Sequence, residues 1–159
     1  MSDRRTPFIE AGERETLVAF LDYLREAVLI KVSGIDDDAL RRSFVPSGTS
    51  LLGLVKHLTM VEIAWFPFSF SGAEVWVPGG ELEPPDTTAS VIDGYRISIA
   101  ESAEIVAAAP DLDQRCVRAA FAPDRMSLRW VLVHMVEETG RHAGHADILR
   151  EQLDGQTGR

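Results

Sequence analysis

Length, composition and charge limit what this chain can be. Its 159 residues, 45% of them hydrophobic, suit one compact domain over residues 1–159 with a real core. A formal net charge of −9 leaves no concentrated basic surface for a nucleic acid, and the single Cys116 excludes an internal disulfide framework. Because no apolar run reaches the roughly 20 residues that span a bilayer, and the first residues lack the apolar core of a secretory signal, we expect a cytoplasmic protein with no membrane partner.

The first 50 residues predict one long helix and one short one. Apolar residues spaced by three and four predict a helix from about Ala11 to Val32, with Gly34 placed to end it. The stretch DDDALRRSF, residues 36–44, predicts a short helical turn before Pro46 breaks the chain.

A second long helix and a long connection follow. Ser50 is the expected N-cap of a helix from Leu51 to about Phe66, and Pro67 is expected to end this helix. Residues Phe68–Pro85 are rich in proline and glycine and predict an irregular connection, with VWV at residues 75–77 as a short strand or an aromatic plug. Long connections of this kind often carry function.

A third helix is predicted over Ala89–Ala109. Thr87 or Thr88 would cap its start, and Pro110 would end it. A loop through Pro123 then leads to the last helix, so the chain as a whole is predicted to be all-α.

The last helix, capped by Ser127 and running to about Leu153 before Gly155, carries polar residues where its periodicity calls for leucine. Its expected core-facing positions follow one another at spacings of three and four: Leu128, Val131, Met135, Glu138, His142, His145 and Leu149. Glu138 and His142 must project from one side of the helix about one turn apart. Buried without partners, such groups would be strongly destabilising, so another side chain, water or a cation must satisfy them.

The second helix offers a third polar group, because His57 follows the three-and-four spacing of the apolar residues around it. If both helices face one core, His57, Glu138 and His142 come together. Two imidazoles and one carboxylate leave a fourth position open on a tetrahedral ion, which is the arrangement of a catalytic zinc site. Cobalt, nickel and iron also accept these ligands, so the pattern predicts a divalent metal without choosing among them.

Two stretches carry a resemblance to a known family: SLLGLVKHLTMVE, residues 50–62, and SLRWVLVHMVEETGRHAGHADILREQLDG, residues 127–155. With them the chain resembles the DinB/YfiT-like superfamily of metal-binding four-helix bundles. It is most similar to the actinobacterial branch related to mycothiol-dependent maleylpyruvate isomerase and thiol transferases. The resemblance implies a four-helix bundle of up-down-down-up topology, with the Phe68–Pro85 segment as a long crossover between helices two and three.

The resemblance also assigns roles to residues. Many members of the superfamily carry one ligand on the second helix and a His-x-x-x-His pair on the last, whereas the isomerase resembles this chain in using His, Glu and His. On that match His57, Glu138 and His142 are the metal ligands, and a low-molecular-weight thiol such as mycothiol is the expected cosubstrate. Unlike the isomerase, the chain is expected to lack a second domain after the last helix, and on that expectation the resemblance does not extend to the isomerase reaction itself.

The remaining histidines and the cysteine have several interpretations. His145 could be an alternative ligand, a group that orients His142, or a substrate contact. We favour the last two roles, and His145 is the first residue to test as a catalytic general base. His134 lies slightly off the periodic positions and is expected to be structural. Cys116 has no histidine or helix N-terminus demonstrably beside it, which disfavours a nucleophile.

One charged pair and one aromatic group have structural interpretations. Glu137 and Arg141, four residues apart, are expected to form a solvated surface pair. Five aromatic residues are expected in core or interface packing, and their density would allow them to wall a pocket: Trp65, Phe66, Phe68, Phe70 and Trp76.

Three functions remain open from the sequence. The first is a metal-dependent thiol transferase or isomerase that acts on a small electrophile, with hydrolysis as a variant. The second is a non-catalytic, metal-stabilised protein that binds small molecules or serves a stress response. The third is a helical interaction module whose polar trio forms a hydrogen-bonded network without an ion. The apolar faces of the bundle are also compatible with a homodimer.

Overall fold

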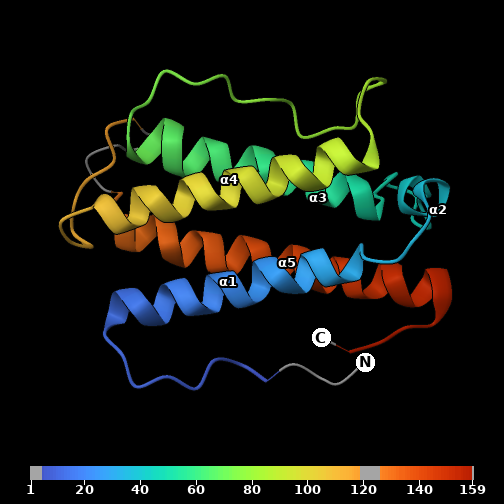
Figure 1. Cartoon of the computed structure of the whole chain (residues 1–159), viewed down its shortest axis with the longest axis horizontal. Helices are drawn as coiled ribbons and strands as arrows, with labels where there is room; N and C mark the ends of the chain where they lie inside the picture. Colours follow the sequence, from blue (N-terminus) through green and yellow to red (C-terminus); the bar gives the residue numbers. More distant parts are fainter. Residues whose placement is uncertain (1–4, 119–125, 159) are drawn as a thin grey trace.

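A computed structural model describes residues 5–118 and 126–158, and within these ranges it is helical, with no named strand (Figure 1). The all-α prediction is confirmed, while Pro123 lies outside the described residues. The elements are, in chain order, α1 (Glu13–Lys31), α2 (Asp37–Arg41), α3 (Leu51–Ile63), the π-helix η1 (Ala64–Phe70), α4 (Thr88–Ala108) and α5 (Leu128–Asp154).

Capping residues explain where α3, α4 and α5 begin and where α5 ends. The side chains of Ser50, Thr87 and Ser127 each accept a hydrogen bond from the backbone N–H three residues further on. Of the two candidate threonines, Thr87 is therefore the cap, and Thr88 is the first residue of α4. Gly155 closes α5 with a φ of 75°, a left-handed conformation that glycine adopts without strain.

Two predictions around the second helix are wrong. Pro67 does not end it, because the chain continues through Pro67 as η1, where the Ser71 N–H bonds to the Phe66 carbonyl five residues back at 2.9 Å. The wider π-turn relieves the clash that a proline ring makes with the preceding turn of an α-helix. Residues 75–77, VWV, form neither strand nor plug: the described chain offers them no strand to pair with, and Trp76 is 86% exposed.

The long helices pack as two pairs. Helix α1 lies along α5, and α3 lies along α4, while α3 also contacts α5 (Figure 1). The connection from η1 to α4 passes along the outside of the α3/α4 pair. The two pairs meet where α3 contacts α5, and the surface depression there, lined by His57 of α3 and His142 of α5, is called the groove.

A buried polar layer divides the core into two apolar clusters. Arg25 of α1 donates two hydrogen bonds to Glu62 of α3, at 2.8 and 2.6 Å, and the Ser102 hydroxyl of α4 donates a third at 2.7 Å. Arg25 and Glu62 are only 4% and 1% exposed. Burial disfavours the charge on Arg25, but the adjacent carboxylate outweighs it, so the pKa of Arg25 lies above its ordinary value. The layer fixes three helices against one another.

One segment has the length and composition of a membrane span. Within residues Leu51–Phe70, which form α3 and η1, an 18-residue window has a mean hydropathy of 1.3, and 56% of that window is buried inside the molecule. Among the described residues no other helix passes this test. A core helix of a soluble protein has the same properties, and the buried share agrees with that role.

Candidate functional site

Three polar side chains lie together in the groove between α3 and α5. The Nε2 atom of His57 is 3.3 Å from Glu138 Oε1, and the Nε2 atom of His142 is 3.1 Å from the same oxygen. The two imidazole rings lie 4.7 Å apart between centroids, inclined edge to face. One ligand atom from each residue lies within 4.8 Å of the other two. We call His57, Glu138 and His142 the trio.

The trio lies at the edge of the core, not within it as the periodicity predicted. The side chains of His57, Glu138 and His142 are 33%, 13% and 15% exposed, whereas Thr139 and Ala143 beside them are buried. An α-helix drifts by about 20° per heptad from a strict spacing of three and four. At Glu138 and His142 the buried side of α5 has moved on to the next residues, Thr139 and Ala143, so the two polar side chains face the groove and solvent can reach them, whereas Leu149 later in the series is buried again.

The electrostatics of the groove favour the protonation states that bind metals. Burial alone would raise the pKa of Glu138, but its hydrogen bond with His57 and the charge of His142 hold that pKa below its ordinary range. Burial lowers the pKa of His142, although attraction to Glu138 opposes this effect. Near neutral pH the carboxylate is ionised and the His142 imidazole is neutral, as metal ligands must be.

The donor set fits a divalent metal ion. Ligand atoms held about 2 Å from a tetrahedral ion lie about 3.3 Å from one another. The two separations between imidazole nitrogen and carboxylate oxygen, 3.3 and 3.1 Å, are close to this value. The same distances also fit hydrogen bonds in which both imidazoles donate to the carboxylate of Glu138. The geometry therefore accommodates an ion and is also compatible with a network that lacks one.

His145 lies next to His142 but is not among the three residues whose donor atoms converge. Its Nδ1 atom is 3.4 Å from the Nδ1 atom of His142, and the ring centroids are 5.4 Å apart. A hydrogen bond between these nitrogens leaves the Nε2 atom of His142 facing Glu138. His145 is exposed, so it is placed to orient His142 or to contact a bound molecule.

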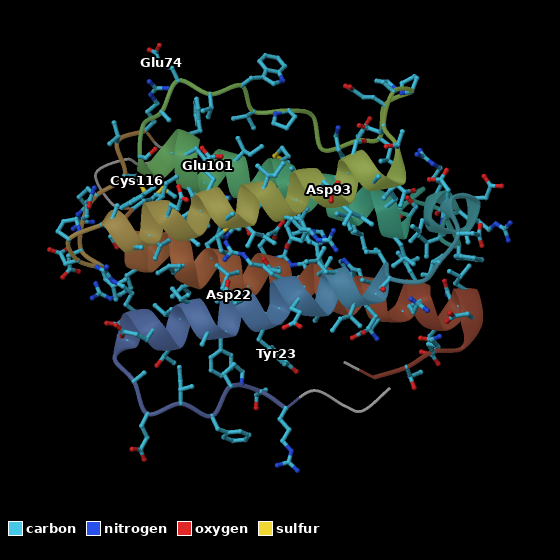
Figure 2. All side chains as sticks on the ribbon, viewed as in Figure 1. Asp22, Tyr23, Glu74, Asp93, Glu101 and Cys116 are labelled. Carbon is cyan, nitrogen blue, oxygen red and sulfur yellow. The ribbon has the colours of Figure 1, made fainter. Side chains whose placement is uncertain are left out.

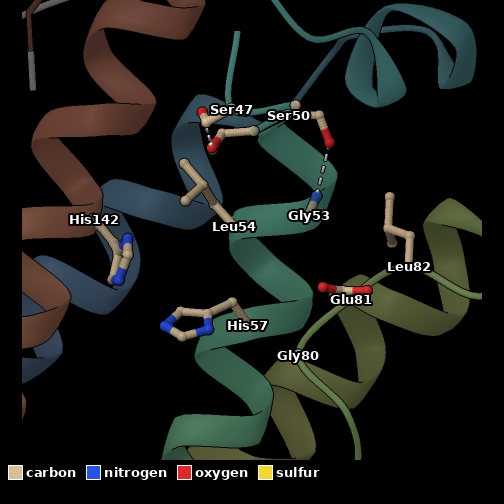
Figure 3. Close-up of a pocket in the computed structure, with 11 residues that line it drawn as sticks. Ser47, Ser50, Gly53, Leu54, His57, Gly80, Glu81, Leu82 and His142 are labelled. Carbon is tan, nitrogen blue, oxygen red and sulfur yellow. Dashed lines mark hydrogen bonds between the residues drawn. The ribbon is translucent and has the colours of Figure 1, made fainter. Parts of the chain in front are cut away.

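Two pockets open beside the trio. The polar pocket, of about 480 Å³, is lined by His57 and His142, by residues 47–50 ahead of α3 and by residues 80–82 of the crossover (Figure 3). The apolar pocket, of about 280 Å³, has these lining residues: Val45, Ser47, Thr49, His145, Ile148 and Leu149. Sequence reasoning singled out the histidines but not residues 47–50, because nothing in a short Ser/Thr/Gly turn distinguishes a pocket wall from an ordinary loop.

The crossover approaches His57 closely at Gly80. A Cβ atom at this position would lie 3.1 Å from the Nδ1 atom of His57 and 3.3 Å from the Met60 methyl group. Glycine therefore leaves room for the imidazole, whose other nitrogen faces Glu138. The stretch Pro-Gly-Gly predicted an irregular connection, but nothing in it predicted this contact.

Several residues around the site have structural roles. His134 stacks on Trp130 and meets Trp65 edge to face, with ring centroids 5.2 and 4.6 Å apart. Phe66 and Phe70 are buried in the core. These contacts confirm a structural role for His134 and core or aromatic packing for Trp65, Phe66 and Phe70, whereas the expectation of core packing is wrong for the exposed Trp76.

The predicted surface pair is present and reaches the trio. Arg141 bonds to Glu137, and both side chains are about half exposed. Arg141 also lies 3.4 Å from Glu138 Oε2, a contact that the sequence pattern did not predict. Arg141 thus adds positive charge on the oxygen that does not face the imidazoles.

Cys116 has the properties of a core residue. It is 6% exposed, packs in the apolar cluster that includes Met135, and lies near the end of the bundle where α4 ends (Figure 2). Burial raises the pKa of its thiol. A protonated, buried thiol is a poor nucleophile, as the sequence context also indicated.

Comparison with known families agrees with the resemblance seen in the sequence. A family described as mycothiol-S-transferase matches residues 16–155, which include nearly all of the four long helices. This family is DinB/YfiT-like, so the superfamily inferred from the sequence is confirmed. No curated protein matches the chain.

Proposed function

Because the chain belongs to the mycothiol-S-transferase family, which implies activity of the thiol-dependent transferase type, we propose that it joins mycothiol or a similar low-molecular-weight thiol to a small electrophile. We further propose that this activity depends on a divalent metal, most simply zinc, held by His57, Glu138 and His142. The observation that carries the proposal is the convergence of these three donors beside a pocket large enough for a small molecule.

Each member of the trio contributes a defined ligand atom. His57 and His142 would bind the ion through Nε2, and Glu138 would bind it through a carboxylate oxygen that also offsets part of its charge. A divalent ion with an open position lowers the pKa of a thiol bound to it, which makes the sulfur nucleophilic near neutral pH. His145 acts through the imidazole of His142, because the Nδ1 atoms of the two rings face each other, and Gly80 leaves free the space beside the Nδ1 atom of His57 that a larger side chain would fill.

The proposed reaction is a nucleophilic substitution or addition by the sulfur of the thiol. The thiol loses its S–H proton, its sulfur forms a bond to the electrophilic carbon, and in a substitution the leaving group departs with the electron pair of the broken bond. In an addition no group leaves and a proton ends on the product; loss of the thiol afterwards would make the same chemistry an isomerisation. His145, on the wall of the apolar pocket and beside His142, is the proposed general base.

Turnover of a chromogenic electrophile tests this proposal. Metal-loaded protein should accelerate release of chloride from 4-nitrobenzyl chloride only when mycothiol is present. Because Cys116 is buried, Cys116→Ser should keep this activity, whereas Glu138→Ala should lose at least about 100-fold, since it removes a ligand and its charge. An inactive Cys116→Ser variant beside an active Glu138→Ala variant would mean that a cysteine nucleophile is at work.

A metal-stabilised binding protein is the second candidate, because the same three donors would join α3 to α5 without any catalysis. If the loaded protein binds no thiol at millimolar concentration, this candidate replaces the transferase. If the protein binds no metal either, the hydrogen bonds of the trio support the interaction module without an ion.

We also infer an up-down-down-up order for the four long helices. Figure 1 supports it, since the colours progress in one direction along α1 and α5 and in the opposite direction along α3 and α4. We propose in addition that residues 1–159 form one domain and that the protein is cytoplasmic, in line with the buried position of Leu51–Phe70. Sedimentation of the purified protein would test the expected homodimer.

A further inference from the structure

We propose that the two pockets beside the trio are separate subsites, in which the polar pocket takes the thiol and the apolar pocket takes the apolar group of the electrophile. This inference rests on the proposed thiol transfer and names the substrate class that it would favour. The electrophile would carry a single aromatic ring or a short alkyl chain next to its reactive carbon.

The polar pocket is the route by which a sulfur atom can reach the trio. Both His57 and His142 line it, so a molecule in this pocket contacts two of the three proposed ligand residues (Figure 3). Its other walls carry hydrogen-bonding groups, including the hydroxyls of Ser47 and Thr49, which lie 2.9 Å apart, and the side chain of Glu81. Such groups complement a thiol that carries sugar hydroxyls, as mycothiol does.

The apolar pocket has the size and lining for a small hydrocarbon group. Val45, Ile148 and Leu149 supply apolar side chains, and His145 supplies the one imidazole on its wall. Apolar cavities of about 150 Å³ bind benzene in proteins. A volume of about 280 Å³ therefore suits a ring with a short substituent.

The boundary between the pockets places the two substrates side by side. Ser47 and Thr49 line both pockets. The imidazole of His145 on the apolar side lies 3.4 Å from the imidazole of His142 on the polar side. An electrophile held in the apolar pocket would thus present its reactive carbon at the boundary, next to the thiol sulfur. A thiol in the apolar pocket would not reach the proposed metal ligands, because no member of the trio lines that pocket.

Matched surface variants test the two subsites without unfolding the protein. Ile148 and Val133 both lie on α5 and are 56% and 52% exposed, but only Ile148 lines the apolar pocket. Glu81 and Glu83 are both exposed on the crossover, but only Glu81 lines the polar pocket. The paired variants are therefore Ile148→Ser with Val133→Ser, and Glu81→Ala with Glu83→Ala.

The kinetic arm separates the two substrates. Ile148→Ser should raise the KM for 4-nitrobenzyl chloride about tenfold and leave the KM for iodoacetamide, which has no apolar group, unchanged. Glu81→Ala should raise the KM for mycothiol severalfold and leave the KM for 4-nitrobenzyl chloride unchanged. Val133→Ser and Glu83→Ala should match the parent. If Ile148→Ser and Val133→Ser behave alike while thiol transfer persists, the subsite assignment is wrong and the proposed function stands.

A binding experiment tests the apolar pocket without any catalysis. Butylbenzene added to the protein without metal should shift the backbone amide resonances of Val45 and of residues 145–149, and Ile148→Ser should weaken this binding about tenfold. Shifts confined to other regions would overturn the apolar subsite. If butylbenzene binds as expected but no thiol is ever transferred, the proposed function fails while the apolar subsite remains.

Discussion

The carboxylate of Glu138 organises the groove at the scale of single residues. Its Oε1 atom faces the Nε2 atoms of both His57 and His142, while its Oε2 atom lies near Arg141. These contacts outweigh burial and keep the pKa of Glu138 low, so the carboxylate is charged over the physiological range. Arg141 offsets part of the negative charge from the side of Oε2, and a divalent ion between the two imidazoles would offset it from the side of Oε1.

Substituting the two neighbouring histidines of α5 should separate a ligand from a supporting residue. His142→Ala should lower zinc affinity by more than about 100-fold, because it removes one of three donors, while His145→Ala should lower it by about tenfold or less. Titration calorimetry with zinc measures both values, and metal content after purification provides a second readout. Equal losses in the two variants would show that the ligand set is different.

The close approach of the crossover to His57 supports a second prediction. Gly80→Ala places a methyl group 3.1 Å from the Nδ1 atom of His57, so the imidazole must shift by a few tenths of an ångström. We expect zinc affinity to fall about tenfold, the size of effect seen when groups that orient a ligand are changed. Gly79→Ala is the matched control, since a Cβ there meets nothing within 4 Å. Loss of affinity in both variants would point to the crossover backbone instead of the His57 contact.

At the scale of elements, α3 carries two polar groups with different tasks. His57 faces the groove, whereas Glu62, one and a half turns later, faces the interior and holds Arg25 and Ser102. The first group is half-buried and open to ligands; the second is sealed among three helices. One helix thus provides a site and the internal contacts that fix its position.

Removing the buried carboxylate should be strongly destabilising. Glu62→Ala leaves the buried Arg25 with only its ion pair to the exposed side chain of Asp22, and we expect the free energy of unfolding to fall by about 3–5 kcal/mol. Asp93→Ala is the control, because it breaks an exposed ion pair with Arg96 on α4 and should change stability by less than about 1 kcal/mol. Urea denaturation measures both effects, and similar values for the two variants would contradict a role for the buried layer.

Local signals in the sequence predicted the helices better than the contacts between them. The caps Ser50, Ser127 and Gly155 act through atoms a few residues away, so they could be read directly from the sequence. The prediction that Pro67 ends the helix was wrong, because the path of the following residues decides whether a proline ends a helix or lies within a π-turn. A residue type alone does not specify that path.

The trio and the buried layer differ in how far they could be predicted. Glu138 and His142 share one helix, so their i, i+4 spacing by itself places them side by side. The ion pair between Arg25 and Glu62 was not predicted, although Glu62 follows Leu58 at helical spacing. Two charges on separate helices do not by themselves indicate that they pair. The partly exposed setting of the trio was not predictable either, because the spacing along one helix does not show which side of that helix its neighbours cover.

At the scale of the whole molecule, the trio adds a link between two helix pairs that also share the apolar core. Helix α3 belongs to the α3/α4 pair and α5 to the α1/α5 pair, so ligands from both would tie the pairs together. The buried Arg25–Glu62 contact also links α1 to α3, but it lies in the interior, away from the groove. An ion in the groove would therefore stabilise the joint between the pairs from its outer side.

Metal removal should consequently lower the stability of the entire protein. Zinc at 100 times its dissociation constant should add about 2.7 kcal/mol to the free energy of unfolding, because the unfolded chain lacks the assembled site. For a chain of this size that corresponds to a rise in Tm of roughly 5–10 °C, reversed by a chelator. His142→Ala should show no such rise, since its two remaining donors cannot hold the ion against water. Calorimetric scans of both proteins, with zinc and with chelator, measure the effect. An equal rise in both would place the zinc elsewhere, whereas no rise in either would leave the hydrogen-bonded trio as the native state of the groove.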